Sequence, residues 1–259
     1  TILNRLANYI EKAVALKKKV KSAMVYPAVT VTVAVAVVSI LLIFVIPTFE
    51  KMFSDFGGTL PGPTQVVINL SHWLGRNWWI VIGAGVVIYI GIKQWRKTEQ
   101  GQRLLDGLAL KLPVVGMLVR KVAVAKFTRT LGTLISSGVP ILDGLDIVAK
   151  TAGNKIVEDA INKTRQAISE GKTIAEPLSQ TKVFPPMVVQ MITVGEETGA
   201  LDEMLTKIAD FYDDEVDSAV EGLTSVIEPV MIVFMGTIVG GMVVAMYLPI
   251  FRMVNVIAG

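Results

Sequence analysis

The most constraining feature of this chain is a run of nineteen residues between Pro27 and Pro47 that contains no charged side chain. Its first half, TVTVAVAVV, alternates as a β-strand would. A helix of this length rises about 1.5 Å per residue and covers about the 30 Å of a bilayer's hydrocarbon core. A lone strand in lipid would leave its backbone N–H and C=O groups without partners, and the sequence offers no matching strands to close a barrel. The run is therefore predicted to be a transmembrane helix.

Two further uncharged blocks occur in the chain, sixteen residues at 77–92 and nineteen residues at 230–248. The shorter block is flanked by Trp78 and Trp79 on one side and by Trp95 on the other, as is typical of membrane–water interfaces. Only 18% of all residues are charged, and the apolar excess is concentrated in these three uncharged blocks. We predict three transmembrane helices, at 27–47, 77–95 and 229–249.

Basic residues are distributed unevenly around the first two predicted spans. The connection between them, residues 48–76, contains only Lys51 and Arg76, whereas several lysines and arginines lie just before the first span and just after the second. Because an excess of lysine and arginine marks the cytoplasmic side, we expect the loop 48–76 to lie outside the cytoplasm and residues 96–228 to lie inside it. The tail 250–259 is then expected outside.

The first and third predicted spans share one proline frame. The equivalent residues are Pro27 with Pro229 and Pro47 with Pro249. Superposing residues 1–53 on 203–255 without a gap gives eight identities, which would be weak evidence without the registered prolines. In both copies an amphipathic helix precedes the span. We therefore predict a duplication in which residues 1–26 are the last helix of a truncated N-terminal cytoplasmic domain.

The segment between the second and third spans has the apolar spacing of helices throughout. Helix ends are indicated by Gly138 followed by Pro140, and by Gly199. The predicted helices lie near 118–137, 140–152, 154–170, 173–180, 186–197 and 201–224. The sequence thus predicts an all-α membrane protein with three transmembrane helices, a cytoplasmic six-helix bundle domain and the remnant of a first, homologous one.

Residue types that carry out catalysis or bind metals are scarce. The chain has no cysteine and a single histidine, His72. The stretch SEGKT at 169–173 resembles the end of a phosphate-binding loop, but Gln166 stands where that motif needs its first glycine. No ionisable residue lies within the predicted spans, which argues against a proton-coupled transporter or an ion channel. We predict no catalytic, cofactor or metal site.

The stretch VGEETGALDEML at 194–205 places Glu196 and Glu197 at a helix C-terminus, where the helix dipole disfavours anions. One interpretation is a structural joint, in which a carboxylate bonds the N-terminal N–H groups of the helix starting near Leu201 or pairs with Arg129 or Arg165. A second is a partner-binding corner, and a third is a catalytic or metal-binding pair of carboxylates.

The two helices that precede the first and third spans carry opposite charge. Residues 1–27 contain six basic and one acidic residue, whereas residues 202–228 contain one basic and nine acidic residues. These runs can be solvated faces, the basic one can contact anionic lipids, or the two helices can pair within or between protomers. The candidate residues are Lys17, Lys18, Lys19 and Lys21 on one side and Asp213, Asp214, Asp217 and Glu221 on the other.

The third predicted span contains a G-x-x-x-G pattern formed by Gly236 and Gly240. Small residues at this spacing let two membrane helices approach closely. Packing against another chain, packing within the protomer and no role at all are each compatible with the pattern.

Three stretches together resemble the PilC/GspF family of inner-membrane platform proteins, which serve type IV pilus assembly and type II secretion. They are KFTRTLGTLISSGVPILDGLDIVAKTAGN, FPPMVVQMITVGEETGALDEMLTKIADFYDDEVD and IEPVMIVFMGTIVGGMVVAMYLPIF. The resemblance implies architectural roles for the positions that match the family's motifs. These positions are Gly138, Val139, Pro140, Gly195, Glu196, Gly199, Leu201, Glu228, Pro229 and Pro249.

The resemblance implies a non-enzymatic platform in the bacterial inner membrane, with the loop 48–76 and the tail in the periplasm. Such a platform couples a cytoplasmic hexameric assembly or retraction ATPase to the extraction of pilins. Other implied partners are inner-membrane alignment proteins and further copies of the chain, and no nucleic acid is implied. A type II secretion platform and, from a different class, a membrane transporter subunit are the alternatives.

The first predicted span can be tested by Val38→Arg, which places a charge near the middle of the uncharged run. A charge at the centre of a membrane helix costs about 2.5–3.5 kcal/mol on insertion scales, so integration into membranes should fall. Carbonate extraction of membranes measures it. Undiminished integration of the variant would mean that the span is misplaced.

Overall fold

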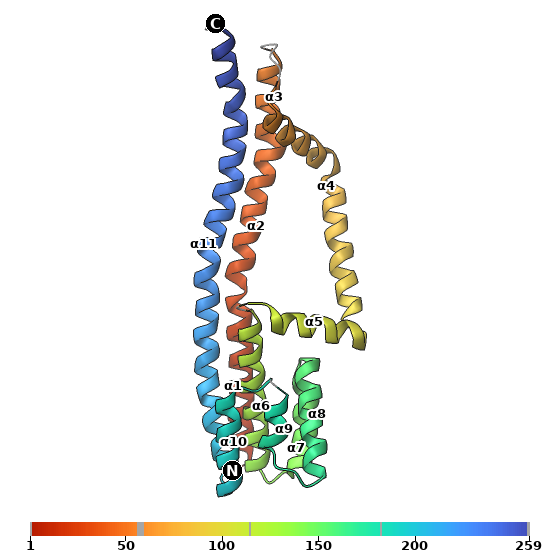
Figure 1. The fold of residues 1–259 in the computed structure, drawn as a ribbon, viewed down its shortest axis with the longest axis vertical. Helices are drawn as coiled ribbons and strands as arrows, with labels where there is room; N and C mark the ends of the chain where they lie inside the picture. Colours follow the sequence, from red (N-terminus) through yellow and green to blue (C-terminus); the bar gives the residue numbers. More distant parts are fainter. Residues whose placement is uncertain (1, 56–59, 114, 182, 258–259) are drawn as a thin grey trace. The chain divides into compact units, whose positions relative to one another are not determined.

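The computed structural model of the chain describes residues 2–55, 60–113, 115–181 and 183–257. Every regular element in these residues is a helix, in agreement with the predicted fold class. Three of the helices are long and apolar enough to cross a membrane, within Ile10–Phe53, Gly62–Trp95 and Leu201–Phe251. The chain divides into two units, which we call the helical unit (Thr1–Ala23 and Gln94–Leu223) and the apolar unit (Met24–Lys93 and Thr224–Gly259) (Figure 1).

The apolar unit contains the run that resembles a strand, and this run is helical. Helix α2 (Val25–Ile40) passes through a π-helical turn, η1 (Leu41–Val45), into α3 (Ile46–Asp55). The hydroxyls of Thr30 and Thr32 donate to the carbonyls four residues earlier in the same helix. The polar groups of these β-branched residues are thus satisfied inside the helix, which suits an apolar environment.

Pro47 leaves a backbone carbonyl without its helical donor. The N–H of Ile46 bonds the carbonyl of Leu41, five residues back, in the π-helical turn. The next carbonyl, that of Leu42, would need the N–H of residue 47, which proline lacks. The hydroxyl of Ser71, a residue that is 1% exposed, donates to this carbonyl from helix α4 (Gly62–Trp95). A serine from another helix therefore replaces the missing donor.

Pro249 creates the same problem in the third candidate span, which is part of the long helix α11 (Leu201–Ile257). The carbonyl four residues before it belongs to Ala245 and has no helical N–H to accept from. The hydroxyl of Thr64, also on α4 and buried, donates to the carbonyl of Ala245. Two neighbouring hydroxyls of α4 thus satisfy the two prolines that the predicted repeat superposes.

Helix α4 is bent at Asn77, whose φ of −118° and ψ of 18° are not helical (Figure 1). The part before the bend buries one face, formed by Thr64, Ile68 and Ser71 at a spacing of three to four residues. Ile68 packs in an apolar cluster with Leu42, Ile46 and Met242. The bend coincides with the predicted start of the second span.

The predicted loop 48–76 is largely helical. It contains the end of α3 and the first part of α4, and His72 Nε2 lies 2.7 Å from Glu50 Oε2 between them. The first part of α4 is amphipathic, with polar residues between the apolar ones, so no continuous apolar run marks it in the sequence. The buried face of this helix can be identified only in the structure, from the backbone carbonyls to which its hydroxyls donate.

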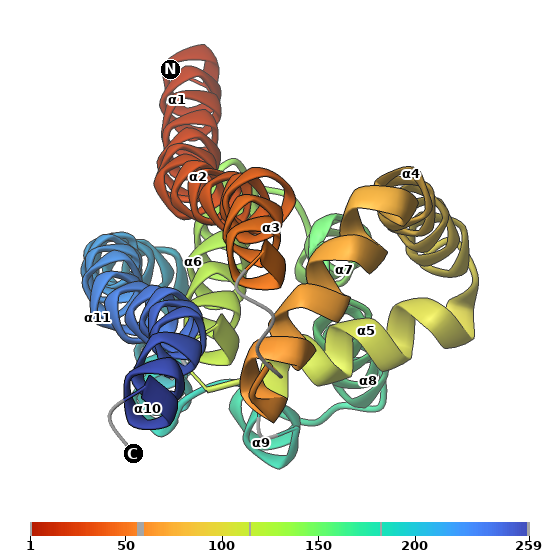
Figure 2. The same ribbon diagram turned by 90° about the horizontal axis from the view of Figure 1, so that it is seen from above.

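The helical unit is built around one apolar core. Its elements are α1 (Ile2–Ala23), α5 (Glu99–Lys111), α6 (Val115–Ser136), α7 (Ile141–Thr151), α8 (Lys155–Ser169), α9 (Ala175–Gln180), α10 (Pro186–Thr198) and the first part of α11 (Figure 2). Fully buried side chains from α6, α7, α8, α10 and α11 meet in the core, among them Phe127, Leu145, Ile161, Ile192 and Leu205. Phe127 also contacts Phe184, with ring centroids 4.8 Å apart.

The six helices predicted for this segment are all present, and apart from the end of α11 their bounds lie within a few residues of the predicted ones. The unit also contains helices beyond these six. Helix α5 was not predicted, α1 packs on α6, and α11 does not end near 224. It continues through Pro229, so this proline does not interrupt the helix before the third candidate span. The end predicted near residue 224 has no capping residue or glycine turn to mark it, unlike the ends predicted at Gly138 and Gly199.

The hydrogen bonds donated by the Thr64 and Ser71 hydroxyls predict that removing either hydroxyl lowers the stability of the folded chain. Replacing Thr64 by Val keeps the side-chain shape but leaves the carbonyl of Ala245 unbonded, and Ser71→Ala does the same to Leu42. Each should cost about 1–2 kcal/mol, because a buried acceptor loses its partner. Titration of the purified chain in micelles with a denaturing detergent measures the loss.

The matched control is Thr237→Val. Thr237 is exposed, and its hydroxyl bonds the carbonyl of Val233, four residues earlier in α11 itself. The residue four positions after Val233 is Thr237, whose backbone N–H remains available to that carbonyl. Equal effects of Thr64→Val and Thr237→Val would contradict the account.

Candidate functional site: the helix joints and the pocket of the helical unit

A set of ion pairs joins three helices of the helical unit. Arg129 on α6 reaches two carboxylates of α11, with 2.8 Å to Asp210 Oδ1 and 2.6 Å to Asp213 Oδ2. Its side chain is only 12% exposed. Lys12 on α1 lies 2.7 Å from the same Asp210 oxygen. Because one arginine is held between two carboxylates in a largely buried position, it fixes α6 against α11 more strongly than a surface pair would.

Two more pairs extend this contact along α11. Lys19 Nζ of α1 lies 2.5 Å from Asp217, and Lys121 Nζ of α6 lies 2.6 Å from Glu215. The basic helix before the first span and the acidic helix before the third are therefore paired within one chain, through Lys12–Asp210 and Lys19–Asp217. We call these contacts, with those of Arg129, the ion-pair ladder.

Lys18, Lys21 and Asp214 of the predicted charge pairing form no ion pair of this ladder among the described residues. Lys18, Lys21 and Asp214 are exposed, as is Glu221. The side chain of Lys17 lies outside the described residues. The described pairs of α1 with α11 thus use Lys12 and Lys19, which lie seven residues apart.

Two glycines allow α11 to pack closely on its neighbours. A Cβ added to Gly195 of α10 would lie 3.0 Å from Leu201 Cα and 3.1 Å from Met204 Cβ. One added to Gly132 of α6 would lie 3.2 Å from Leu205 Cβ. Larger residues at either position would push the start of α11 outward. Gly199, with φ of 73°, ends α10 in the left-handed conformation that glycine favours.

Glu196 bonds the backbone, but not at the helix we expected. Its two carboxylate oxygens accept the N–H of Ile174 at 2.9 and 3.0 Å, at the start of α9. Glu196 thus forms a structural joint with a helix start, but the donor is at α9 and not at the predicted helix near Leu201. The turn after α8 brings the start of α9 beside α10, which the sequence spacing could not show.

The two arginines proposed as partners of Glu196 are used elsewhere. Arg165 of α8 pairs with Asp146 of α7, and Arg129 pairs with α11. Lys150 and Arg165 together hold the pKa of the Asp146 carboxyl below its ordinary value. Glu197 is exposed on the outer side of the joint. Among the two glutamates, only Glu197 is placed to meet another molecule.

The remaining motif residues of the helical unit form turns. Gly138 has φ of 82°, and the N–H of Val139 bonds the carbonyl of Leu134, which closes the end of α6. Pro140 is the N-cap of α7. Gly171, with φ of 85°, follows α8 directly, so SEGKT is the end of a helix. A phosphate-binding loop would instead follow a strand and open a helix.

The motif residues of the third candidate span lie within α11. Glu228 and Pro229 are exposed, whereas Pro249 is buried. At Gly236 and Gly240 an added Cβ would meet no described atom within 4 Å. The interpretation that these glycines pack within the protomer is therefore not supported by the described residues.

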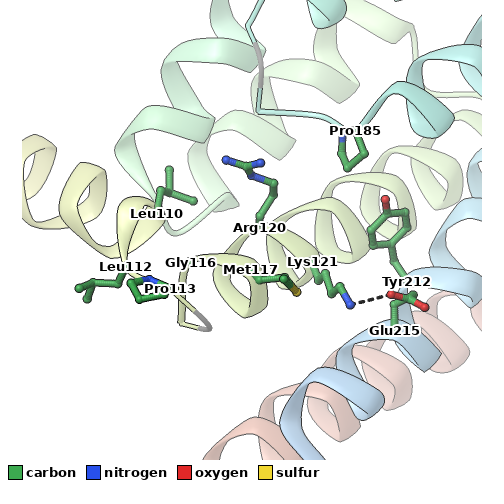
Figure 3. Close-up of a pocket in the computed structure, with 10 residues that line it drawn as sticks. All are labelled: Leu110, Leu112, Pro113, Gly116, Met117, Arg120, Lys121, Pro185, Tyr212 and Glu215. Carbon is green, nitrogen blue, oxygen red and sulfur yellow. Dashed lines mark ion pairs between the residues drawn. The ribbon is translucent and has the colours of Figure 1, made fainter. Parts of the chain in front are cut away.

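An open pocket of about 410 Å³ lies between α5, α6 and α11 (Figure 3). Arg120 projects at its rim, the Lys121–Glu215 pair and Tyr212 form one side, and apolar side chains form the other. The lining residues are Leu110, Leu112, Pro113, Gly116, Met117, Arg120, Lys121, Pro185, Tyr212 and Glu215. Sequence reasoning missed the pocket because it missed α5, although leucines at 104, 108 and 112 in a basic segment were a usable signal.

The described residues contain no group of histidine and acidic side chains that could hold a metal ion. The contacts described above are structural: ion pairs, a backbone cap, tight turns and a basic, partly apolar pocket.

Comparison with known families decides the relationship. The profile of the type II secretion system protein F family matches residues 1–47 and 127–249. The chain belongs to this family. The two matched segments end at Pro47 and Pro249, the residues that the predicted duplication superposes.

Named relatives of this family member fall into two groups. The chain is 57% identical over 99% of its length to the type IV pilus assembly protein PilC of Myxococcus xanthus, and 46% identical over 98% to TapC of Aeromonas hydrophila. It is 35% identical over its whole length to the type II secretion system protein F of Vibrio cholerae. It covers 61%, 62% and 64% of these three proteins, so it spans about three fifths of their length.

The ion-pair ladder predicts an order of mutational effects. Arg129→Met leaves Asp210 and Asp213 facing each other beside a largely buried site, and should cost about 2–3 kcal/mol. Lys19→Met removes a pair whose lysine is 58% exposed, against 12% for Arg129, and should change stability little. Thermal unfolding of the purified chain, followed by circular dichroism, measures both. A loss for Lys19→Met as large as that for Arg129→Met would refute the ranking.

Proposed function

We propose that this chain is part of a type IV pilus assembly platform in the bacterial inner membrane. The observation that carries the proposal is the 57% identity to a protein named for type IV pilus assembly, against 35% to a type II secretion protein. A secretion platform is the alternative within the same family. The difference in identity favours the pilus role.

The proposed membrane arrangement follows the charge distribution. Residues 27–47, 77–95 and 229–249 span the membrane, residues 48–76 and the tail 250–259 face the periplasm, and residues 96–228 face the cytoplasm. The three apolar helices support the spans, and the basic residues flanking the first two support the orientation.

We propose that the platform works with a separate cytoplasmic hexameric ATPase. The phosphate-loop-like stretch is a helix end, so nothing in it supports nucleotide hydrolysis by this chain. Helix α11 runs unbroken from Leu201 to Ile257, through the ladder and into the third span. One continuous helix is a suitable element for transmitting a movement of the cytoplasmic part to the membrane part.

The proposal can be tested by photocrosslinking in cells of the source organism. A photoreactive amino acid replaces Glu197, the exposed glutamate of the joint, and the same amino acid at exposed Val66 in α4 is the matched control. We expect capture of the pilus ATPase from position 197, identified by mass spectrometry, and none from position 66.

Deletion of the ATPase gene should abolish the crosslinked product. Capture of a secretion ATPase instead would favour the alternative role. Capture of solute-transport proteins alone, or equal capture from both positions, would overturn the proposed function.

A further inference from the structure

Helix α5 is fixed to the helical unit by one of its faces. The carboxylate of Asp106, a residue that is 5% exposed, accepts the N–H of Lys155 at 2.7 Å, at the start of α8. Arg103 lies 2.9 Å from Asp159 of the same helix. These contacts set the rotation of α5 about its own axis, and so determine which residues lie on the opposite face.

The opposite face of α5 is apolar and exposed. Leu104, Leu108 and Leu112, spaced four residues apart, are 61%, 58% and 46% exposed. Val115 and Met117 at the start of α6 are exposed as well, and Leu112 and Met117 lie at the pocket (Figure 3). We call these five residues the apolar stripe. A contiguous exposed patch of large apolar side chains indicates a surface that another molecule or a membrane covers.

The charges around the apolar stripe are basic. Three basic residues of the same unit flank it without an ion pair among the described residues: Lys97, Lys111 and Arg120. Arg120 stands at the rim of the pocket (Figure 3). On α5 itself only Glu99 is acidic and exposed, because the Asp106 carboxylate is buried against α8. An apolar helix face with a basic border fits an anionic lipid surface.

The chain itself holds α5 close to the end of the second span. Only three residues separate Trp95 at the end of α4 from Glu99 at the start of α5. The Thr98 hydroxyl donates to the carbonyl of Trp95 at 2.7 Å and accepts the N–H of Gly101 at 3.2 Å. A Cβ on Gly101 would lie 2.1 Å from that same carbonyl oxygen, so the turn is tight and needs glycine.

We propose that α5 is an interfacial helix, which places the apolar stripe in the cytoplasmic leaflet and binds anionic phospholipid headgroups through Lys97, Lys111 and Arg120. The proposal rests on the second span of the proposed function. A second copy of the chain or a soluble partner would be the other possible occupants. The basic border and the short, fixed connection to the span favour lipid over either of them.

The absence of cysteine in the sequence allows a direct test with the full chain. Single-cysteine variants Leu108→Cys, Val87→Cys and Ile147→Cys are labelled with an environment-sensitive fluorophore and reconstituted into phosphatidylcholine–phosphatidylglycerol vesicles carrying a nitroxide-labelled lipid. Val87 lies in the second span, and Ile147 is an exposed apolar residue on α7. We expect lipid quenching at 108 and 87, and iodide quenching only at 147.

Lipid charge and the basic border give a second readout. Lys97→Glu with Lys111→Glu, or vesicles without phosphatidylglycerol, should reduce the quenching at 108 and leave that at 87 unchanged. The exposed pair Lys150→Glu with Lys172→Glu, away from the stripe, is the matched control and should change neither. Unchanged quenching at 108 in all these conditions would refute the headgroup contact.

Each remaining outcome is decisive. If position 87 is quenched by lipid but 108 is quenched by iodide, the interfacial helix is wrong and the span stands. If 108 is protected from both quenchers, protein covers the stripe and the lipid proposal fails. If position 87 is not quenched by lipid, the membrane placement in the proposed function fails, and with it the basis of the interfacial helix.

Discussion

Every backbone carbonyl in an apolar environment must find a donor, and this constraint organises the apolar unit. Prolines frame two of its candidate spans, and the proline that closes each of them removes one donor. Ser71 and Thr64 supply the replacements, from neighbouring positions on one face of α4. The first part of α4 is therefore held by hydrogen bonds as well as by the packing of Ile68. Because the prolines are equivalent in the predicted repeat, one helix serves both copies in the same way.

The helical unit depends on a different constraint, the close approach of α11 to its neighbours. Gly132 and Gly195 provide the space, and Arg129 provides the charge that two α11 carboxylates require. The lysines of α1 then add to the contact from the other repeat. The opposite charges of α1 and of the first part of α11 thus form ion pairs within one chain. Exposed groups such as Glu197 and Arg120 are left for contacts with other molecules.

Much of this could be predicted from the sequence because the signals are local. Length and charge decided that TVTVAVAVV is helix. Gly138 with Pro140 located one helix end, and Gly199 located another. The first part of α4 and all of α5 were missed because their apolar residues alternate with polar or charged ones and form no continuous apolar run. The partner of Glu196 could not be predicted, because it depends on which helix start lies beside α10.

The central claim is that the chain crosses the membrane three times, with residues 48–76 outside and the helical unit inside. Single cysteines in this cysteine-free chain at exposed Val66 and exposed Gln180 test it directly. Intact cells are treated with a maleimide that cannot cross the inner membrane, and permeabilised cells give full labelling as the reference. The account predicts labelling at 66 in intact cells and at 180 only after permeabilisation. Labelling at 180 in intact cells, or protection at 66, would contradict it.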